Sequence, residues 1–93
     1  MFTTVSIHQM IPGKEDSAIE MFSTNTRIAR KLEGFIGRDI LIAVDDPLKL
    51  TTVTSWKTMG QVQAFKTNPD RPRGGGPYVS SEDITVYEDV PVV

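Results

Sequence analysis

Three side chains in this sequence could take part directly in catalysis: His8, Arg38 and Trp56. His8 is the only histidine, and an imidazole with an ordinary pKa of about 6.5 can remove a phenolic proton. The Arg38 guanidinium could bind a phenolate or a carboxylate, and the Trp56 indole could stack on a flat aromatic substrate and donate its N–H. Each also has a structural interpretation. His8 could be a hydrogen-bonded histidine at a subunit contact, Arg38 a salt-bridged or solvated strand charge, and Trp56 a core aromatic.

A second group of side chains could bind or orient a substrate: Phe65, Asn68 and Tyr78. Phe65 lies on the apolar side of a short helical pattern, and Asn68 and Tyr78 offer polar groups. Tyr78 follows residues 70–77, DRPRGGGP, a loop that we expect to lie over the mouth of a pocket. The three glycines do not form a nucleotide-binding P-loop, because the required lysine and serine and the strand–loop–helix context are missing. Two arginines in this loop leave anion binding open.

Composition and charge exclude several classes of protein. The chain has 10 Lys and Arg against 12 Asp and Glu, so we expect no nucleic-acid partner. No apolar run approaches the roughly 18 residues of a membrane span and no signal pattern is visible, so we expect no membrane association. The chain has no cysteine, and its one histidine has no carboxylates at ligand spacing, so we expect no metal site. The lack of cysteine suits a cytoplasmic location.

The first half of the chain predicts a strand and a long helix that would position these side chains. Residues 2–11 alternate as a strand, and we expect the face with Val5 and Ile7 to meet the helices, because it is the more apolar one. The face with His8 would then be covered by something else. Residues 14–33 predict a helix whose apolar stripe has a single polar break at Asn25. We expect Gly34 to cap its C-terminus in a left-handed conformation.

The second half predicts a hairpin, a short helix and a last strand. Residues 35–44 and 49–56 read as strands on either side of a turn, with Ile36 and Arg38 on one face, and both faces are apolar enough to be covered. Thr58 and Gln61 form a T-x-x-Q capping box that begins a helix. Residues 79–90 supply the last strand, and 91–93 a tail.

The resulting order, β-α-β-β-α-β, is that of the ferredoxin-like split repeat. We therefore predict one α+β domain over residues 1–93, with an antiparallel sheet and both helices on one face. A second copy of the chain is the commonest cover for the other face of such a sheet.

Several short segments, in this order and spacing, resemble the antibiotic biosynthesis monooxygenase domain family of the dimeric α/β-barrel superfamily. They are Pro12-Gly13-Lys14-Glu15, Glu33-Gly34-Phe35, Asp45-Asp46-Pro47, Val53-Thr54-Ser55-Trp56-Lys57, Ala64-Phe65 and Asn68-Pro69. The resemblance implies a homodimer whose two sheets face each other, with a pocket for a small aromatic or hydrophobic ligand in each subunit. Many members oxidise phenols, anthrones or quinols with O2 and use neither metal nor flavin, so the resemblance implies no cofactor.

Another branch of this family degrades haem. That branch carries an axial histidine in the second half of the chain, where this sequence has no histidine, and Ser6 stands near the place of its first-strand asparagine. We rank haem degradation third. The leading interpretation is a cofactor-independent monooxygenase, and the alternative is a non-catalytic homodimer that binds a small ligand or regulates a partner. A cavity lined by Trp56 and polar groups would favour the first, and a pocket filled by the protein's own side chains the second.

Overall fold

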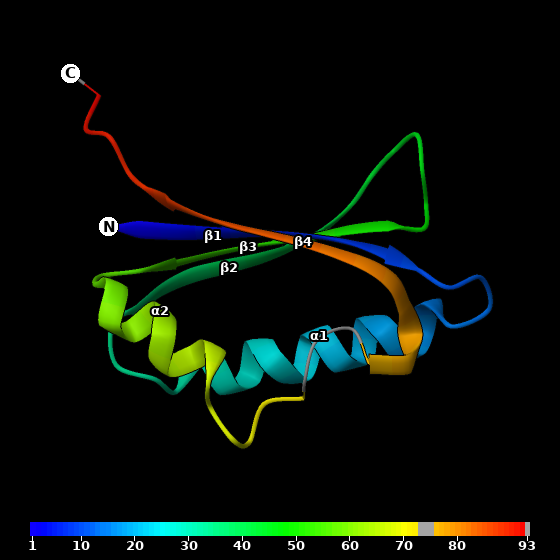
Figure 1. The fold of residues 1–93 in the computed structure, drawn as a ribbon, viewed down its shortest axis with the longest axis horizontal. Coiled ribbons are helices and arrows are strands. Elements are labelled where there is room, and N and C mark those ends of the chain that lie inside the picture. Colours follow the sequence, from blue (N-terminus) through cyan, green and yellow to red (C-terminus); the bar gives the residue numbers. More distant parts are fainter. Residues whose placement is uncertain (73–75, 93) are drawn as a thin grey trace.

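A computed structural model describes residues 1–72 and 76–92 of the chain (Figure 1). The elements run β1 (Phe2–Met10), α1 (Glu15–Arg30), β2 (Phe35–Ile42), β3 (Lys49–Trp56), α2 (Met59–Lys66) and β4 (Val79–Glu88), with a 3₁₀ turn at Gly76–Tyr78 before β4. This order confirms the predicted split repeat. The predicted loop at 70–77 and the tail at 91–93 lie partly outside the described residues.

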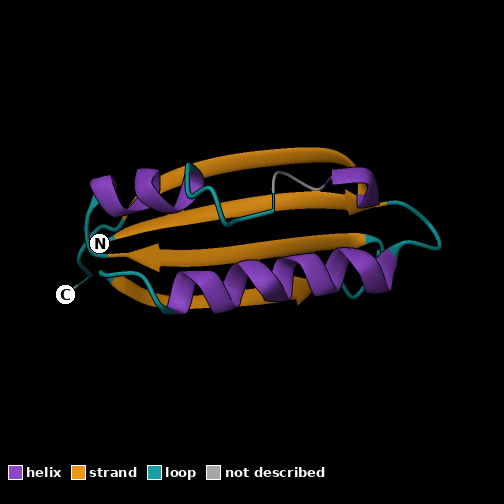
Figure 2. Ribbon diagram, turned by 90° about the horizontal axis from the view of Figure 1, so that it is seen from below, coloured by secondary structure: helices purple, strands orange, loops and turns teal. Residues whose placement is uncertain are grey.

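The four strands form one antiparallel sheet in the order β2-β3-β1-β4. Both helices lie on one side of this sheet, and Figure 2, viewed from the helix side, shows them crossing in front of it. Residues directly opposite each other in antiparallel strands point to the same face. Ser6 lies opposite Thr52 and Ile84, and Val5 lies opposite Val53 and Thr85, so these two sets mark the two faces.

The helices cover the face of β1 that was predicted to lie away from them. His8 and Met10 are each only 2% exposed, and Met10 packs in the same cluster as Phe22 of α1. The face with Val5 and Ile7, predicted to meet the helices, lies on the opposite side of the sheet. The prediction was wrong because both faces of β1 carry apolar residues, and the inner one also holds polar side chains that are enclosed by the fold.

A bulge in β2 changes which side chains share the face of Arg38. Phe35 pairs with Trp56 and Gly37 with Ser55, so Ile36 is an extra residue in the ladder. Phe35 therefore points into the core beside Trp56, and Ile36, predicted to share the face of Arg38, is 47% exposed.

Helix α1 ends earlier than the sequence pattern predicts. It stops at Arg30 with Lys31 as its cap, and Gly34 lies in the turn beyond. Gly34 does adopt the predicted left-handed conformation, with φ of 82°. The capping box of α2 is confirmed, because the Thr58 hydroxyl accepts from the Gln61 N–H and the Gln61 side chain accepts from the Thr58 N–H.

The layer between sheet and helices contains two apolar clusters separated by polar side chains. One cluster surrounds Met10 and Phe22, and the other surrounds Trp56 and Phe65. Between them lies what we call the polar layer, which consists of Ser6 and His8 of β1, Asn25 and Thr26 of α1, Arg38 of β2, and Thr52 and Thr54 of β3. Burying a polar side chain is unfavourable unless the side chain forms a hydrogen bond or binds a ligand. The polar layer is therefore a candidate site.

Candidate functional site

A pocket opens between the sheet and α2, at one end of the polar layer. It holds about 500 Å³ of empty space, counting space that is open to solvent. Its described walls come from all four strands, from α2 and from the segment after it. They are Thr4, Ser6, Arg38, Thr54, Trp56, Val62, Gln63, Phe65, Lys66, Arg71, Ile84 and Val86. The cavity volume of the pocket is about 50 Å³, well below the roughly 300–1,000 Å³ of typical small-molecule sites, and the rest of the space includes open solvent.

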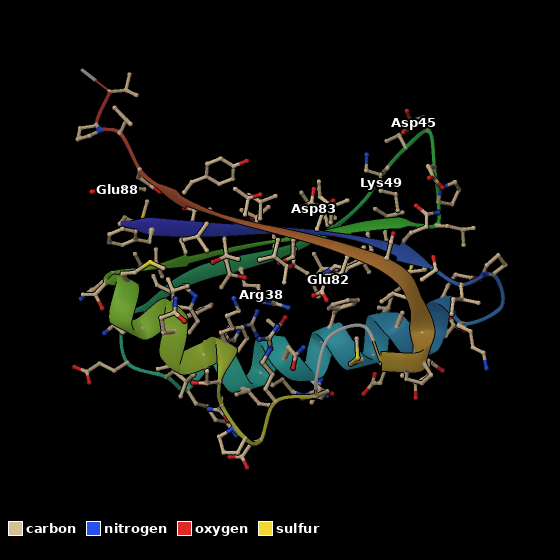
Figure 3. The ribbon with its side chains drawn as sticks, in the orientation of Figure 1. Arg38, Asp45, Lys49, Glu82, Asp83 and Glu88 are labelled. Atoms are coloured by element: carbon tan, nitrogen blue, oxygen red, sulfur yellow. The ribbon has the colours of Figure 1, made fainter. Side chains whose placement is uncertain are left out.

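Arg38 crosses from β2 into the polar layer and is held by two hydroxyl groups. Its Nε donates to Thr26 Oγ1 at 2.9 Å, and its Nη1 donates to Thr54 Oγ1 at 2.8 Å. Burial, reinforced by the charge of Arg71, lowers the pKa of Arg38 to about 10, so the guanidinium is still cationic at neutral pH. Figure 3 shows Arg38 on the helix side of the sheet. The site therefore holds a fixed positive charge inside the fold.

Two aromatic side chains form the apolar wall of the pocket. Trp56, only 1% exposed, has its ring centroid 5.3 Å from that of Phe65 and 5.6 Å from that of Phe35. Trp56 and Phe65 both line the pocket and both belong to the same core cluster. The structural interpretation of Trp56 as a core aromatic is thus correct, and contact between its indole and a ligand stays a prediction.

His8 lies deeper in the polar layer and is not among the residues that line the pocket. Its ring centroid is 4.5 Å from that of Phe22, and its Nδ1 lies 3.8 Å from Glu82 Oε1, which is too far for a hydrogen bond. Burial lowers the pKa of His8 below 6.5; Glu82 acts in the opposite direction, and Arg38 and Arg71 add to the lowering. The imidazole is therefore neutral at neutral pH, the form in which it can accept a proton.

The structure does not bring Asn68 and Tyr78 to this pocket. Asn68 Oδ1 accepts from the N–H of Asp70 at 2.8 Å in a local turn. Tyr78 packs against the other apolar cluster, which contains Met10, and its carbonyl accepts from the Ile11 N–H at 3.0 Å. Their roles in substrate binding stay predictions.

Asn25 is one of the residues of the polar layer that sequence reasoning did not select as functional. It is 0% exposed, and neither its Nδ2 nor its Oδ1 has a hydrogen-bond partner among the described residues. An unpaired buried amide costs about 1–3 kcal/mol. The signal was present in the sequence, because Asn25 is the one polar break in the apolar stripe of its helix.

Neither a metal ion nor haem fits the described residues. No group of three His, Cys, Asp or Glu side chains that could hold a metal occurs within residues 1–72 and 76–92. The only histidine, His8, is 2% exposed and packs against Phe22, so it offers no axial ligand to haem in the pocket. In the described part of the chain, no helix is long and apolar enough to cross a membrane.

The fold resembles that of solved structures described as antibiotic biosynthesis monooxygenases. No protein-family model and no curated protein matches the sequence. Solved structures do match over almost the whole chain. A protein from Nitrosomonas europaea, provisionally described as an antibiotic biosynthesis monooxygenase, is 18% identical with a TM-score of 0.85, over 98% of this chain and 100% of that one.

Two further solved structures show the same fold. A protein from Mycobacterium tuberculosis is 10% identical with a TM-score of 0.87, over 98% of this chain and 96% of that one. SnoaB, a cofactor-independent oxygenase from Streptomyces nogalater that was solved as a point mutant, is 11% identical with a TM-score of 0.80, over 99% of this chain and 95% of that one. The predicted ferredoxin-like fold is thereby confirmed. At these identities the likeness establishes the fold, and function must be argued from the site.

Proposed function

We propose that this protein is a cofactor-independent monooxygenase that oxidises a phenol-, anthrone- or quinol-type aromatic compound with O2. The observation that carries the proposal is the pocket itself. It combines an aromatic wall, Trp56 and Phe65, with a half-buried cation, Arg38, and the hydroxyl groups of Ser6 and Thr54. The fold shared with a cofactor-independent oxygenase supports the same class of reaction.

The protein needs to supply only binding and electrostatic stabilisation of the substrate anion, because the substrate supplies all the electrons. An electron-rich phenol or anthrone that has lost a proton can pass one electron to O2, and the resulting radical pair can combine to a peroxide. Loss of water from the peroxide leaves a carbonyl. In sum, a CH2 group and O2 give a C=O group and H2O. A cation beside the substrate oxygen stabilises its anion and so favours the first step.

In this proposal Arg38 stabilises the substrate anion, Trp56 and Phe65 hold its ring, and His8 accepts the proton. Arg38 lies on the helix side of the sheet with two donor groups held by Thr26 and Thr54. His8 lies on the same face of β1 as Ser6, which lines the pocket, and its lowered pKa keeps it neutral. Proton transfer from the pocket to His8 would pass along this face.

The test is O2 uptake by the purified, metal-stripped protein with a panel of anthrones, naphthoquinols and catechols, against buffer and boiled protein. We expect uptake above both controls, an oxygenated product, and a decrease of about a hundredfold in kcat/KM for Arg38→Gln, as for the loss of one preorganised anion-stabilising group. Arg27→Gln is the matched control, because Arg27 is an exposed arginine of α1 outside the pocket. Equal loss in both variants would remove the assignment of Arg38.

The second candidate is a non-catalytic dimer that binds the same kind of ligand. One observation favours it: His8, the only histidine, lies outside the pocket lining. Ligand binding without O2 uptake across the panel would support this candidate over the oxygenase.

We further propose that the chain forms a homodimer through the sheet face that the described helices do not cover. We also propose a cytoplasmic location, which suits the lack of cysteine. That face carries Val5, Ile7, Val53, Leu41 and Tyr87, and Leu41 and Tyr87 are 50% and 53% exposed. The β2–β3 connection and the C-terminal segment rise on the same side of the sheet (Figure 1). An exposed apolar surface on a small chain marks a contact with another chain, and one self-complementary face suits a two-fold pair.

A further inference from the structure

The described walls of the pocket carry charges of one sign. Arg38, Lys66 and Arg71 are cationic, and none of the described lining residues is acidic. The chain as a whole has the opposite balance, with 12 acidic and 10 basic residues. Glu82 lies on the same face of the sheet, but it does not line the pocket and its carboxylate is 3.8 Å from His8. The pocket is therefore a positive region in an acidic protein.

Arg38 is a half-buried cation that the described residues do not neutralise. Its hydrogen-bond acceptors are the hydroxyl groups of Thr26 and Thr54, and it has no ion-pair partner within residues 1–72 and 76–92. Hydroxyl groups fix the orientation of a guanidinium but do not balance its charge. An enclosed charge without a partner is destabilising, and an anion that entered the pocket would offset that cost.

A single aromatic ring links two of the three cations. The Arg71 guanidinium lies 4.4 Å from the centroid of Phe65, and the Arg38 guanidinium lies 5.7 Å from the same centroid. Both distances are within the range of cation–π contacts, which hold a guanidinium against a ring while its N–H groups remain directed elsewhere. Phe65 thus keeps two planar, bidentate donors at one pocket, and such donors match a carboxylate.

We propose that the ligand of this pocket is an aromatic carboxylic acid, bound as its carboxylate by Arg71 and Lys66, with its ring beside Trp56 and Phe65 and its hydroxyl oxygen at Arg38. The proposal names the substrate class of the proposed oxygenase and rests on it only in placing the reaction in the same pocket. Simple phenols and anthrones lack a carboxylate, so the proposal narrows the panel to hydroxylated aromatic acids.

A carboxylate fits the pocket better than a phosphate. Phosphate sites commonly use the free N–H groups at a helix N-terminus. Here the pocket meets α2 through Val62, Gln63, Phe65 and Lys66. At the N-terminus of that helix, the capping box engages the N–H groups of Thr58 and Gln61. Side-chain cations alone remain, which suits a singly charged group.

The test compares a carboxylate with its matched neutral amide, 6-hydroxy-2-naphthoate and 6-hydroxy-2-naphthamide, and with a phosphate, 2-naphthyl phosphate, each titrated calorimetrically at about pH 7.5. Trp56 is the only tryptophan, so quenching of its fluorescence reports binding at this site. We expect the carboxylate to bind about tenfold or more tightly than the amide, as expected for one charge-assisted contact. Arg71→Gln should abolish most of this preference, and Arg27→Gln should preserve it.

Arg71→Gln carries the test if Arg38→Gln fails to fold, since Arg38 is the more deeply enclosed of the two. Equal affinity for carboxylate and amide, tighter binding of the phosphate, or no binding of any of the three would overturn the proposal. O2 uptake with neutral anthrones would then still support the oxygenase. Conversely, a carboxylate preference without any O2 uptake would support this inference and contradict the oxygenase.

Discussion

At the scale of single residues, the most informative group is His8, because burial and a carboxylate act on it in opposite directions. Burial lowers its pKa below 6.5 and Glu82 partly restores it. The unfolded chain therefore takes up the proton first as the pH falls, and the free energy of unfolding decreases from about pH 6.5 downward. Above that range both states hold a neutral imidazole, so the contribution of His8 is constant.

We predict that the single histidine resonance will titrate below pH 6.5 by NMR, and that Glu82→Gln will move its midpoint lower still. The reason is that Glu82 is the one described group that favours the imidazolium. Asp83→Gln is the control, because Asp83 lies opposite Ile7 on the other face of the sheet (Figure 3). A midpoint above 6.5, or an upward shift in Glu82→Gln, would contradict the prediction.

At the scale of elements, Gly34 couples the end of α1 to the start of α2. Its φ of 82° is unfavourable for any other residue, and a Cβ there would collide with the side-chain amide of Gln61. That amide is the part of the capping box that accepts from the Thr58 N–H. The turn after α1 and the cap of α2 therefore both require that residue 34 has no side chain.

We predict that Gly34→Ala lowers the free energy of unfolding by about 2 kcal/mol, from backbone strain and a displaced cap together. Gly37→Ala is the matched control, since a Cβ at Gly37 meets nothing within 4 Å and its φ is not left-handed. Urea unfolding measures both, and the control should stay within about 0.5 kcal/mol of the parent. Similar losses in the two variants would show that Gly34 has no special role.

At the scale of the whole molecule, the proposed homodimer would form through the sheet face that the described helices do not cover. We predict a mass of twice 10.3 kDa by light scattering, and a shift to one chain for Leu41→Glu, because a charge would be buried in an apolar contact. Leu41 is 50% exposed on that face. Ile19→Glu is the control on the exposed side of α1 and should leave the dimer intact. A monomeric parent protein would remove the dimer from the proposal.

The sequence by itself determined the elements and their order. Helix caps and turns depend on residues close together in the chain. The Thr58 hydroxyl accepts from an N–H three residues away, and Gly34 stands where the backbone is left-handed, a conformation that favours glycine. Alternation likewise placed His8 with Ser6 and Met10 on one face of β1. It also marked Asn25 as the polar break in α1, although its role in the polar layer went unrecognised.

Only the tertiary structure decided which faces meet. When both faces of a strand carry apolar residues, the alternation does not show which face is buried. The side of β1 that meets α1 therefore depends on how the whole sheet packs. The bulge at Ile36 brings Phe35 beside Trp56, and no local sequence pattern predicts this bulge. The pocket joins Arg38 and Arg71 through Phe65, residues that are far apart in the chain. Long-range packing sets such contacts. The sequence could therefore suggest individual site residues such as Arg38, but only the fold shows which of them lie together.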